Sequence, residues 1–577
     1  MIDNFPPFAV FYLGSLLVLL TKGRIRNTIL VAVPVISFIL LTNVDAGKYL
    51  EYSFLDYTLN LYRVDKLSSV FGYAFLIISV AIAFYGFHVK NNKEYVIGLI
   101  YAGSGLGAVF AGDLLTLYFF WEVMTIASTF IIWNGKTKDC IQAGFRYFLF
   151  HLAGGLILLF GIILYISETG STEFVHMGWT DLATGLIMLG FGVNAAWPLL
   201  HTWLVDAYPK GSFFGTVMLT VFTTKTAIYT LARGFSGEEL LIVVGAVMTA
   251  FPIFYAVLVN DLRKVLSYSL INQLGFMVAG IGVGTTLAIN GAVGQAFVHI
   301  MFKSLLFMGM GAVFYRTGKI NATDLGGLYK YMPWTTVFTI VGALTISTFP
   351  FFSAFVTKSM ILSSIAHEGY GIVWLTLVFA SAGVLHHSGI KIPYFAFFSH
   401  DSGLRPKEAP WNMLVAMGFL AGLNILLGIY PAPLINILPY EVSYNPYTLG
   451  HVIYQYQLLL FSILAFTLLL RSGVYPAEIR AINLDFDYFY RKAGTIFMKF
   501  EDNYILPCFN FFKKLFFESI PSLLNYLTKD PVKLIYRVLE DEPMGDDGIK
   551  MQGWLIGWSV FVVTVFLVIY LLVFMHF

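Results

Sequence analysis

Residues 294–314 read GQAFVHIMFKSLLFMGMGAVF, an apolar stretch that carries only a few polar side chains, among them His299 and Lys303. A helix needs about 20 such residues to cross the hydrocarbon core of a membrane. A charged side chain at the centre of that helix costs on the order of 2.5 to 3.5 kcal/mol even on the lenient insertion scale. The stretch therefore predicts a membrane-spanning helix in which Lys303 needs a specific reason to be present.

The composition of the whole chain agrees with that stretch. Of 577 residues, 58% are hydrophobic and 12% are charged, against about 45–50% and 25% in soluble domains. The 35 basic and 33 acidic residues nearly balance, which argues against nucleic acid as a partner. Two cysteines, Cys140 and Cys508, are too few for a disulfide framework, a structural zinc site or a cysteine-ligated iron–sulfur cluster. We expect a protein in contact with the lipid bilayer, with no metal or other cofactor of its own.

Similar apolar runs, divided by short polar connections, recur along the chain. They predict an all-α polytopic membrane protein with about 14–16 transmembrane helices, and continuous runs exclude a β-barrel. The first run, near 6–21, follows no basic segment and precedes no cleavage site, so we expect it to be a retained helix. Lysine and arginine gather at alternate connections, which the positive-inside rule assigns to the cytoplasm: 22–26, 89–94 and 135–139. The N-terminus is then predicted to lie outside.

Several ionisable residues fall near the centres of predicted helices: Glu122, Lys225, Lys303 and Lys358. His299 lies four residues before Lys303, so the two share one helix face. Lys264 opens a predicted helix, where snorkelling to the membrane surface is an equally good interpretation. Buried groups of both signs without metal-ligand spacing are typical of a chain of titratable sites for proton transfer. In the competing interpretation, the charges only hold the helices of a structural membrane anchor together.

Prolines interrupt two of the apolar runs. Pro198 and Pro209, with Asp206 between them, precede Lys225, and Pro350 precedes Lys358. Paired interruptions indicate broken helices and inverted repeats in transporters, although two ordinary proline-ended helices would give the same pattern. Secondary candidates for a proton path are Asp206, His151, His386, His387 and Lys391. For His151 a hydrogen-bonded packing role is equally compatible with the sequence.

Residues 471–550 are rich in charged and aromatic side chains and precede a last apolar run. Phenylalanine, leucine and isoleucine recur near helical spacing beside lysines, which predicts an amphipathic helix in the headgroup plane. A solvated loop with short helices is the alternative. Four prolines argue against one unbroken rod: Pro507, Pro521, Pro531 and Pro543.

Five motifs in this order resemble a known family: FFWEVMTIAS, WLVDAYPKGS followed by TTKTAIY, DLRKVLSYSLINQLGF, HIMFKSLLFMG and FFSAFVTKSMI. They are similar to the antiporter-like subunits of respiratory complex I, membrane-bound hydrogenases and Mrp-type cation/proton antiporters. The stretch GIKIPYFAFFS, with PWNMLVAM downstream, looks most like the D-type subunit of the Mrp antiporters.

The resemblance implies two inverted five-helix repeats, each containing a broken helix, joined by a polar axis along the membrane centre. It implies that Glu122 pairs with Lys225 as the broken-helix lysine and that Lys264 is the central connecting lysine. His299 and Lys303 match the connecting pair of the second half, and Lys358 matches its terminal group. The expected organisation is N-terminal helices at 1–94, repeats at 95–284 and 285–400, further helices at 401–470, the interfacial segment at 471–550 and a last helix at 551–577.

Two positions depart from the family pattern. Tyr208 stands where the family usually has a histidine, and Ser359 stands where an acid usually follows the terminal lysine. We therefore expect a proton-translocating subunit of a multisubunit antiporter in the inner (cytoplasmic) membrane, with other membrane subunits as partners and H+ and Na+ as candidate ions. The same proton module inside a redox-driven complex, a membrane-bound hydrogenase or complex I relative, is the alternative.

Overall fold

The structure, a computed structural model, describes residues 5–54, 56–473, 479 and 483–529. Within these ranges ten helices are long and apolar enough to cross a membrane, and three shorter apolar helices accompany them. The all-α polytopic architecture predicted from the apolar runs is confirmed. The span expected at 551–577 lies outside the described residues.

The N-terminal part contains one feature that the apolar runs did not predict. Between α2 and α3 the chain forms an antiparallel hairpin, with an irregular register near Leu50. Its second strand alternates partly exposed and buried residues toward its end, the pattern of a strand with one covered face. The elements are α1 (Pro7–Leu20), α2 (Gly23–Thr42), β1 (Gly47–Phe54), β2 (Tyr57–Val64) and α3 (Lys66–Gly86).

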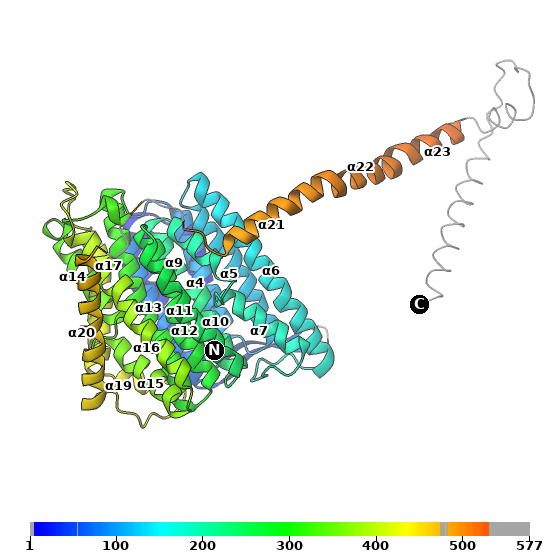
Figure 1. Ribbon diagram of the computed structural model, residues 1–577. Helices are drawn as coiled ribbons and strands as arrows, with labels where there is room; N and C mark the ends of the chain where they lie inside the picture. The colour runs from blue at the N-terminus through cyan, green and yellow to red at the C-terminus, as the bar shows by residue number, and fades with distance from the viewer. Residues whose placement is uncertain (1–4, 55, 474–478, 480–482, 530–577) are drawn as a thin grey trace, which may run out of the picture. The chain divides into compact units, whose positions relative to one another are not determined.

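The middle of the chain forms two similar series of helices, which pack side by side in Figure 1. The first series is α4 (Asn92–Phe110), α5 (Leu114–Trp133), α6 (Lys138–Thr169), α7 (Leu182–Asn194), α8 (Thr202–Ala207), α9 (Phe213–Leu219) and α10 (Phe222–Gly234). The second series is α11 (Glu239–Leu258), α12 (Leu262–Val283), α13 (Thr286–Thr317), α14 (Pro333–Ile346), α15 (Ser353–His367), α16 (Gly371–Val384) and α17 (Lys391–Pro393).

Landmarks in the two series repeat at a constant interval. The long helices α6 and α13 both have 32 residues and both end at a left-handed glycine, Gly170 and Gly318. The acids that cap α5 and α12, Asp113 and Asp261, each form an isolated β-bridge just beyond the long helix. Asp261 follows Asp113 by 148 residues, and Gly318 follows Gly170 by the same number. The two series are therefore repeats of one arrangement of helices, 148 residues apart along the chain.

Each long helix is followed by a broken one, as the prolines predict. In the first series Ala196 and Leu199 have φ of 59° and 70° around Pro198. In the second series Thr348 and Phe351 have φ of 59° and 73° around Pro350. Left-handed backbone is uncommon outside glycine and is characteristic of functional sites. The same irregular turn therefore divides α7 from α8 and α14 from α15.

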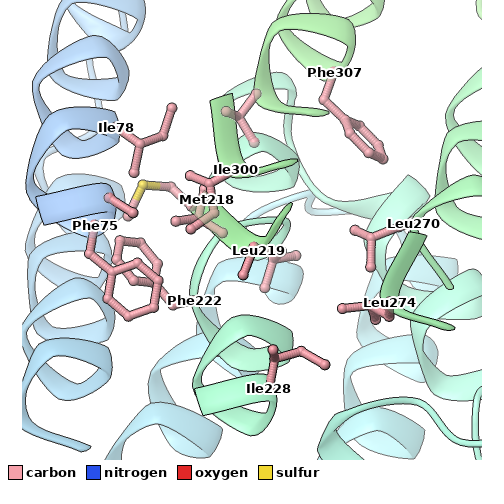
Figure 2. Close-up of a cluster of buried hydrophobic side chains, with 14 of the residues drawn as sticks. Phe75, Ile78, Met218, Leu219, Phe222, Ile228, Leu270, Leu274, Ile300 and Phe307 are labelled. Atoms are coloured by element: carbon pink, nitrogen blue, oxygen red, sulfur yellow. The ribbon is translucent and has the colours of Figure 1, made fainter. Parts of the chain in front are cut away.

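Apolar side chains fill the space between the two series. Figure 2 shows ten labelled residues of this core, contributed by α3, α9, α10, α12 and α13: Phe75, Ile78, Met218, Leu219, Phe222, Ile228, Leu270, Leu274, Ile300 and Phe307. Because lipid is as apolar as these side chains, close packing rather than exclusion of water holds such helices together. The core surrounds α10 and α13, the helices that carry Lys225 and Lys303.

The helices after the second series are α18 (Trp411–Ile429), α19 (Ala432–Ile435) and α20 (Leu449–Arg471). A separate unit begins at Phe486, and its described part is helical without interruption: α21 (Asp487–Phe500), α22 (Leu506–Lys514) and α23 (Ile520–Lys529), joined by π-helical turns. The expectation that proline would break this segment is wrong for Pro507 and Pro521. Each follows a π-helical turn, Glu501–Ile505 or Leu515–Ser519, because a widened turn accommodates the proline ring and its missing N–H. Pro531 and Pro543 lie outside the described residues.

Candidate proton-transfer site

Lys225 lies on α10, four residues beyond the interruption that separates α10 from α9, and its side chain is fully buried. The Nζ atom donates to the carbonyl oxygen of Thr220 at 2.5 Å and contacts the hydroxyl of Thr224 at 3.2 Å. Thr220 is the residue at which α9 ends. The ammonium group is thus held at the interruption between α9 and α10, and not at the α7–α8 break around Pro198.

Glu122 is half-buried on α5, and its carboxylate lies against α6. A Cβ atom at Gly155 would fall 2.0 Å from Oε1 of Glu122, so only a glycine leaves room for the carboxylate in this position. Oε1 has no hydrogen-bond partner in the described part of the chain. The direct ion pair expected between Glu122 and Lys225 is also absent there. Lys225 instead binds the Thr220 carbonyl, while Glu122 is directed at the α5–α6 contact.

Three ionisable groups of the second series lie deep in the protein. His299 and Lys303 on α13 are fully buried, and Lys358 on α15 is 2% exposed. Both ring nitrogens of His299 and both lysine Nζ atoms lack a hydrogen-bond partner among the described residues. The Nζ of Lys358 lies 4.4 Å from the centroid of the Phe276 ring, a cation–π contact. Buried polar groups of this kind are normally satisfied by internal water.

A buried amide network lies beside these groups, and sequence reasoning missed it. Gln295 on α13 donates to Gln273 on α12 at 3.0 Å and accepts from the Thr357 hydroxyl at 2.5 Å. Gln273 in turn donates to Asn272 at 2.9 Å. Gln295 is one turn from His299, and Thr357 adjoins Lys358. The network therefore connects the second broken helix to α12 and to the turn of α13 before His299, and the amides inside apolar runs were its only sequence signal.

His151 and His299 occupy equivalent places. Each lies 19 residues before the glycine that ends its long helix. His151 is fully buried on α6, and its Nδ1 lies 2.7 Å from the Asn194 side-chain oxygen at the end of α7. The same count makes Gly155 the counterpart of Lys303. The long helix of the second series therefore carries the ammonium group of Lys303 at this position, and the long helix of the first series carries Gly155, which lies beside Glu122.

Two of the predicted residues have other surroundings. Asp206 on α8 forms ion pairs with Arg146 and Lys210, at 2.8 and 2.7 Å, which gives it a place in a charge cluster. Lys264 lies in the first turn of α12 and is partly exposed. The adjacent Arg263 is the buried cation, and its guanidinium contacts the Gly211 carbonyl at 3.2 Å. The structure does not bring Lys264 together with the buried lysines.

The group around α17 connects the second series to its neighbours. Lys391 is fully buried and donates to the carbonyls of Val257 and Val259 at the end of α11, at 2.5 and 2.9 Å. His386 contacts the Ser462 carbonyl on α20 at 2.8 Å. A further chain of polar contacts runs from Nδ1 of His387 through Ser388 to Ser269 on α12, each step 2.8 Å long.

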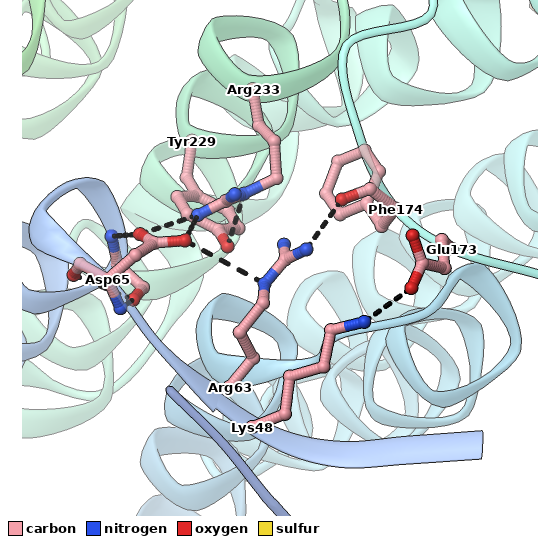
Figure 3. A network of polar contacts seen from close by, with 8 residues as sticks. Lys48, Arg63, Asp65, Glu173, Phe174, Tyr229 and Arg233 are labelled. Atoms are coloured by element: carbon pink, nitrogen blue, oxygen red, sulfur yellow. Dashed lines mark hydrogen bonds and ion pairs between the residues drawn. The ribbon is translucent and has the colours of Figure 1, made fainter. Parts of the chain in front are cut away.

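The far end of α10 is fixed by a polar network outside the membrane spans (Figure 3). Arg233 makes two contacts with the carboxylate of Asp65, at 2.8 and 2.6 Å, and a third with the Tyr229 phenol at 2.8 Å. Burial raises the pKa of Asp65, but Arg233, the Ser68 backbone N–H and Arg63 together bring that pKa below its ordinary value. Nearby, Lys48 of the hairpin pairs with Glu173. The network ties the helix of Lys225 to the cap of α3.

The family model described as NADH:quinone oxidoreductase/Mrp antiporter, TM, matches residues 111–384. A D-type Na(+)/H(+) antiporter subunit of Alkalihalophilus pseudofirmus is 25% identical over 471 residues, which cover 74% of this chain and 94% of that protein. A chain in the structure of the Mrp complex from Dietzia sp. DQ12-45-1b superposes with a TM-score of 0.64 at 19% identity, covering 75% of this chain and 93% of that one. A chain of the archaeal membrane-bound sulfane sulfur reductase superposes with a TM-score of 0.68 at 22% identity, covering 78% and 97%.

Proposed function

Because the family model described as NADH:quinone oxidoreductase/Mrp antiporter, TM, matches residues 111–384, we propose that this chain belongs to that family and is the proton-translocating subunit of a multisubunit sodium/proton antiporter. One observation carries the proposal: Lys225, His299, Lys303 and Lys358 are buried on helices of both series, and all but Lys225 lack hydrogen-bond partners for their ionisable atoms in the described ranges. Burial of an ionisable side chain away from water costs free energy, so such a residue is retained for a function. Here that function is to bind and pass protons.

Transfer along this path depends on water and on repulsion between like charges. A water molecule that hydrogen-bonds to two of the unpartnered nitrogens connects them for proton transfer. Because Lys303 and Lys358 lie in a low-dielectric interior, a proton on one makes a proton on the other less favourable. A proton that arrives at one site therefore promotes release from the next. Glu122 supplies the negative charge of the first series from the surface of α5 that faces Gly155.

The repeat landmarks refine the organisation of this path. We place the boundary between the five-helix units at 235–238, so that α4 to α10 form the first unit and α11 to α17 the second, with α7–α8, α9–α10, α14–α15 and α16–α17 each counted as one interrupted helix. The capping acids Asp113 and Asp261 and the two proline breaks then occupy matching positions. His151 becomes the first-unit counterpart of His299 in the path, and Lys391 a lateral connection at the end of α11. Lys264 takes the place of a surface cation at the start of α12.

The basic residues in the connections between helices support an orientation of the chain in the membrane. Basic residues follow α1, α3 and α5, as with Lys22, Lys90 and Lys136. By the positive-inside rule we assign these connections to the cytoplasm and the N-terminus to the outside of the cell membrane. The ion-transport step in this chain needs no cofactor of its own, and other membrane subunits complete the transporter.

A redox-driven complex is the second candidate. The likeness to the chain of the sulfane sulfur reductase, a respiratory membrane complex, favours it, because 97% of that chain is covered. The experiment that separates the two is identification by mass spectrometry of the proteins that co-purify with the tagged chain from native membranes. We expect membrane subunits only, and proton flux in vesicles that requires sodium. Iron–sulfur or nickel subunits would instead establish the redox complex.

A structural anchor is the remaining interpretation of the buried charges. Lys225→Gln in the complete complex separates it from a transporter. We expect sodium-dependent proton flux to be lost while the complex still assembles, because glutamine keeps the polar contact to Thr220 and removes the exchangeable charge. Loss of assembly in this variant, with normal flux in the residual complex, would support the anchor.

A further inference from the structure

A buried acid from outside both five-helix units lies at the first broken helix. Asp485 stands two residues before α21, and its Oδ2 accepts a hydrogen bond from the Tyr268 phenol of α12 at 2.6 Å. The same oxygen lies 3.2 Å from Nε2 of His201. The side chains of His201 and Asp485 are only 4% and 6% exposed. Neither residue belongs to the path described above.

The place of His201 in the break makes this contact informative. His201 is the third residue after Pro198, and Ser353 is the third residue after Pro350 in the second break. Ser353 donates to Asn424 on α18 at 2.7 Å. Each break is therefore met at the same register position by a side chain from outside its five-helix unit. A neutral pair is enough to hold the second break, whereas the first is met by two groups that bind protons.

We infer that His201 and Asp485 form a proton-binding site at the first broken helix. The inference rests on the proposed function and extends it to the connection before α21. With the proton bound, an imidazolium faces a carboxylate and the pair is neutral. When the proton leaves, a neutral imidazole faces the carboxylate, the pair carries one negative charge, and Tyr268 still donates to Oδ2.

The surroundings of the pair suit proton exchange on the imidazole. Nδ1 of His201 is buried and has no hydrogen-bond partner within the described residues, so one nitrogen faces Asp485 and the other is available to water or to a second donor. The ring of His201 packs on Phe251, with centroids 4.6 Å apart. Tyr255 stacks on Tyr268 at 5.2 Å, so phenols are the ionisable groups that these contacts bring next to the pair from α11 and α12. The Asp206 cluster lies farther along α8.

The test compares isosteric and charge-conserving variants in the complete complex. Asp485→Asn keeps the shape and hydrogen-bonding capacity of the side chain and removes its charge, whereas Asp485→Glu keeps the charge. Asp487→Asn is the matched control, because Asp487 is an acid two residues away whose partly exposed side chain pairs with Arg491 at 2.7 Å on α21. Removal of a group that transfers protons typically costs about 100-fold or more. For Asp485→Asn we expect proton flux to fall by about 100-fold or more while assembly is unchanged. For Asp485→Glu and Asp487→Asn we expect near-normal flux.

Normal flux in assembled Asp485→Asn would overturn the inference and leave a structural anchor. If that variant does not assemble, His201→Gln decides, because glutamine retains a polar group at the site but binds no proton near neutral pH. Full flux with His201→Gln then overturns the inference, and a loss of about 100-fold with intact assembly supports it. Lys303→Gln, measured in parallel, separates failure of the proposed function from failure of the inference about His201 and Asp485. Normal flux there refutes the proposed function itself, whereas flux lost in Lys303→Gln but kept in Asp485→Asn refutes only the inference.

Discussion

Gly155→Ala should move the carboxylate of Glu122 without disturbing the fold. The added Cβ would lie 2.0 Å from Oε1, and the three nearest atoms to it all belong to Glu122. Ordinary contact begins at 3.4 Å, so the oxygen must shift by about 1.4 Å relative to α6. The obstacle is the free end of a flexible side chain, and alanine is the better helix former by about 0.5–1 kcal/mol. Assembly should therefore be preserved.

Transport, in contrast, should fall in this variant. A misplacement of about 1 Å in a reacting group is sufficient to cost as much as 100-fold in rate, so we expect proton flux reduced by about 10- to 100-fold. The assay is sodium-driven proton flux in vesicles containing the complete complex, normalised to the amount of assembled complex. Gly422→Ala is the matched control, since a Cβ there meets no atom within 4 Å. Wild-type flux in assembled Gly155→Ala would refute the role given to the position of Glu122.

Three further outcomes are expected. Lys303→Gln and Lys358→Gln should each abolish flux while the thermal stability of the complex stays the same or rises, because a buried ammonium without a hydrogen-bond partner is costly. A large fall in stability would contradict this reasoning. Asp65→Ala should destabilise the protein by about 1–2 kcal/mol, measured by thermal unfolding in detergent, because it removes the cap of α3 and the carboxylate that pairs with Arg233. Since the folded-state pKa of Asp65 lies below its ordinary value of 3.8, its contribution to stability should be present above that pH and lost as the pH falls through the folded-state pKa. A fall in wild-type but not Asp65→Ala stability over that acidic range checks the sign.

The main elements of the fold were predictable because they depend on local chemistry. Apolar runs of membrane length identify spanning helices wherever they occur, and Pro198 and Pro350 mark the breaks because proline removes a helical hydrogen bond. The buried lysines were equally visible, since a charge inside an apolar run is conspicuous whatever its partners are. Sequence reasoning therefore identified Lys225, Lys303 and Lys358, which the structure places as buried residues of helices α10, α13 and α15.

The contacts of those residues were not predictable, because they depend on tertiary structure. No proline or glycine marks the interruption at Thr220. The sequence therefore did not predict that Lys225 would donate to the Thr220 carbonyl and not pair with Glu122. Asp485 lies in a segment rich in charge, 284 residues from His201 along the chain, and nothing local distinguishes it from its exposed neighbours. The hairpin after α2 gives only a weak sequence signal, because its strands alternate only in part.

The two π-helical turns in the helix from Asp487 to Lys529 have a consequence for the direction of its side chains. Successive residues of an α-helix are about 100° apart around the axis, and a π-helical turn holds one residue more than an α-helical turn. Each of the two turns therefore shifts the angular phase of everything downstream by about one residue, so that Phe512 and Phe516 do not point where a regular helix would aim them from Phe489. Deletion of a single residue from Glu501–Ile505 would restore the regular phase as far as the second turn, Leu515–Ser519, and would rotate the aromatic rings beyond the deletion to another side of the helix. Pro507 and Pro521 thus mark the places where the aromatic face of the helix changes direction.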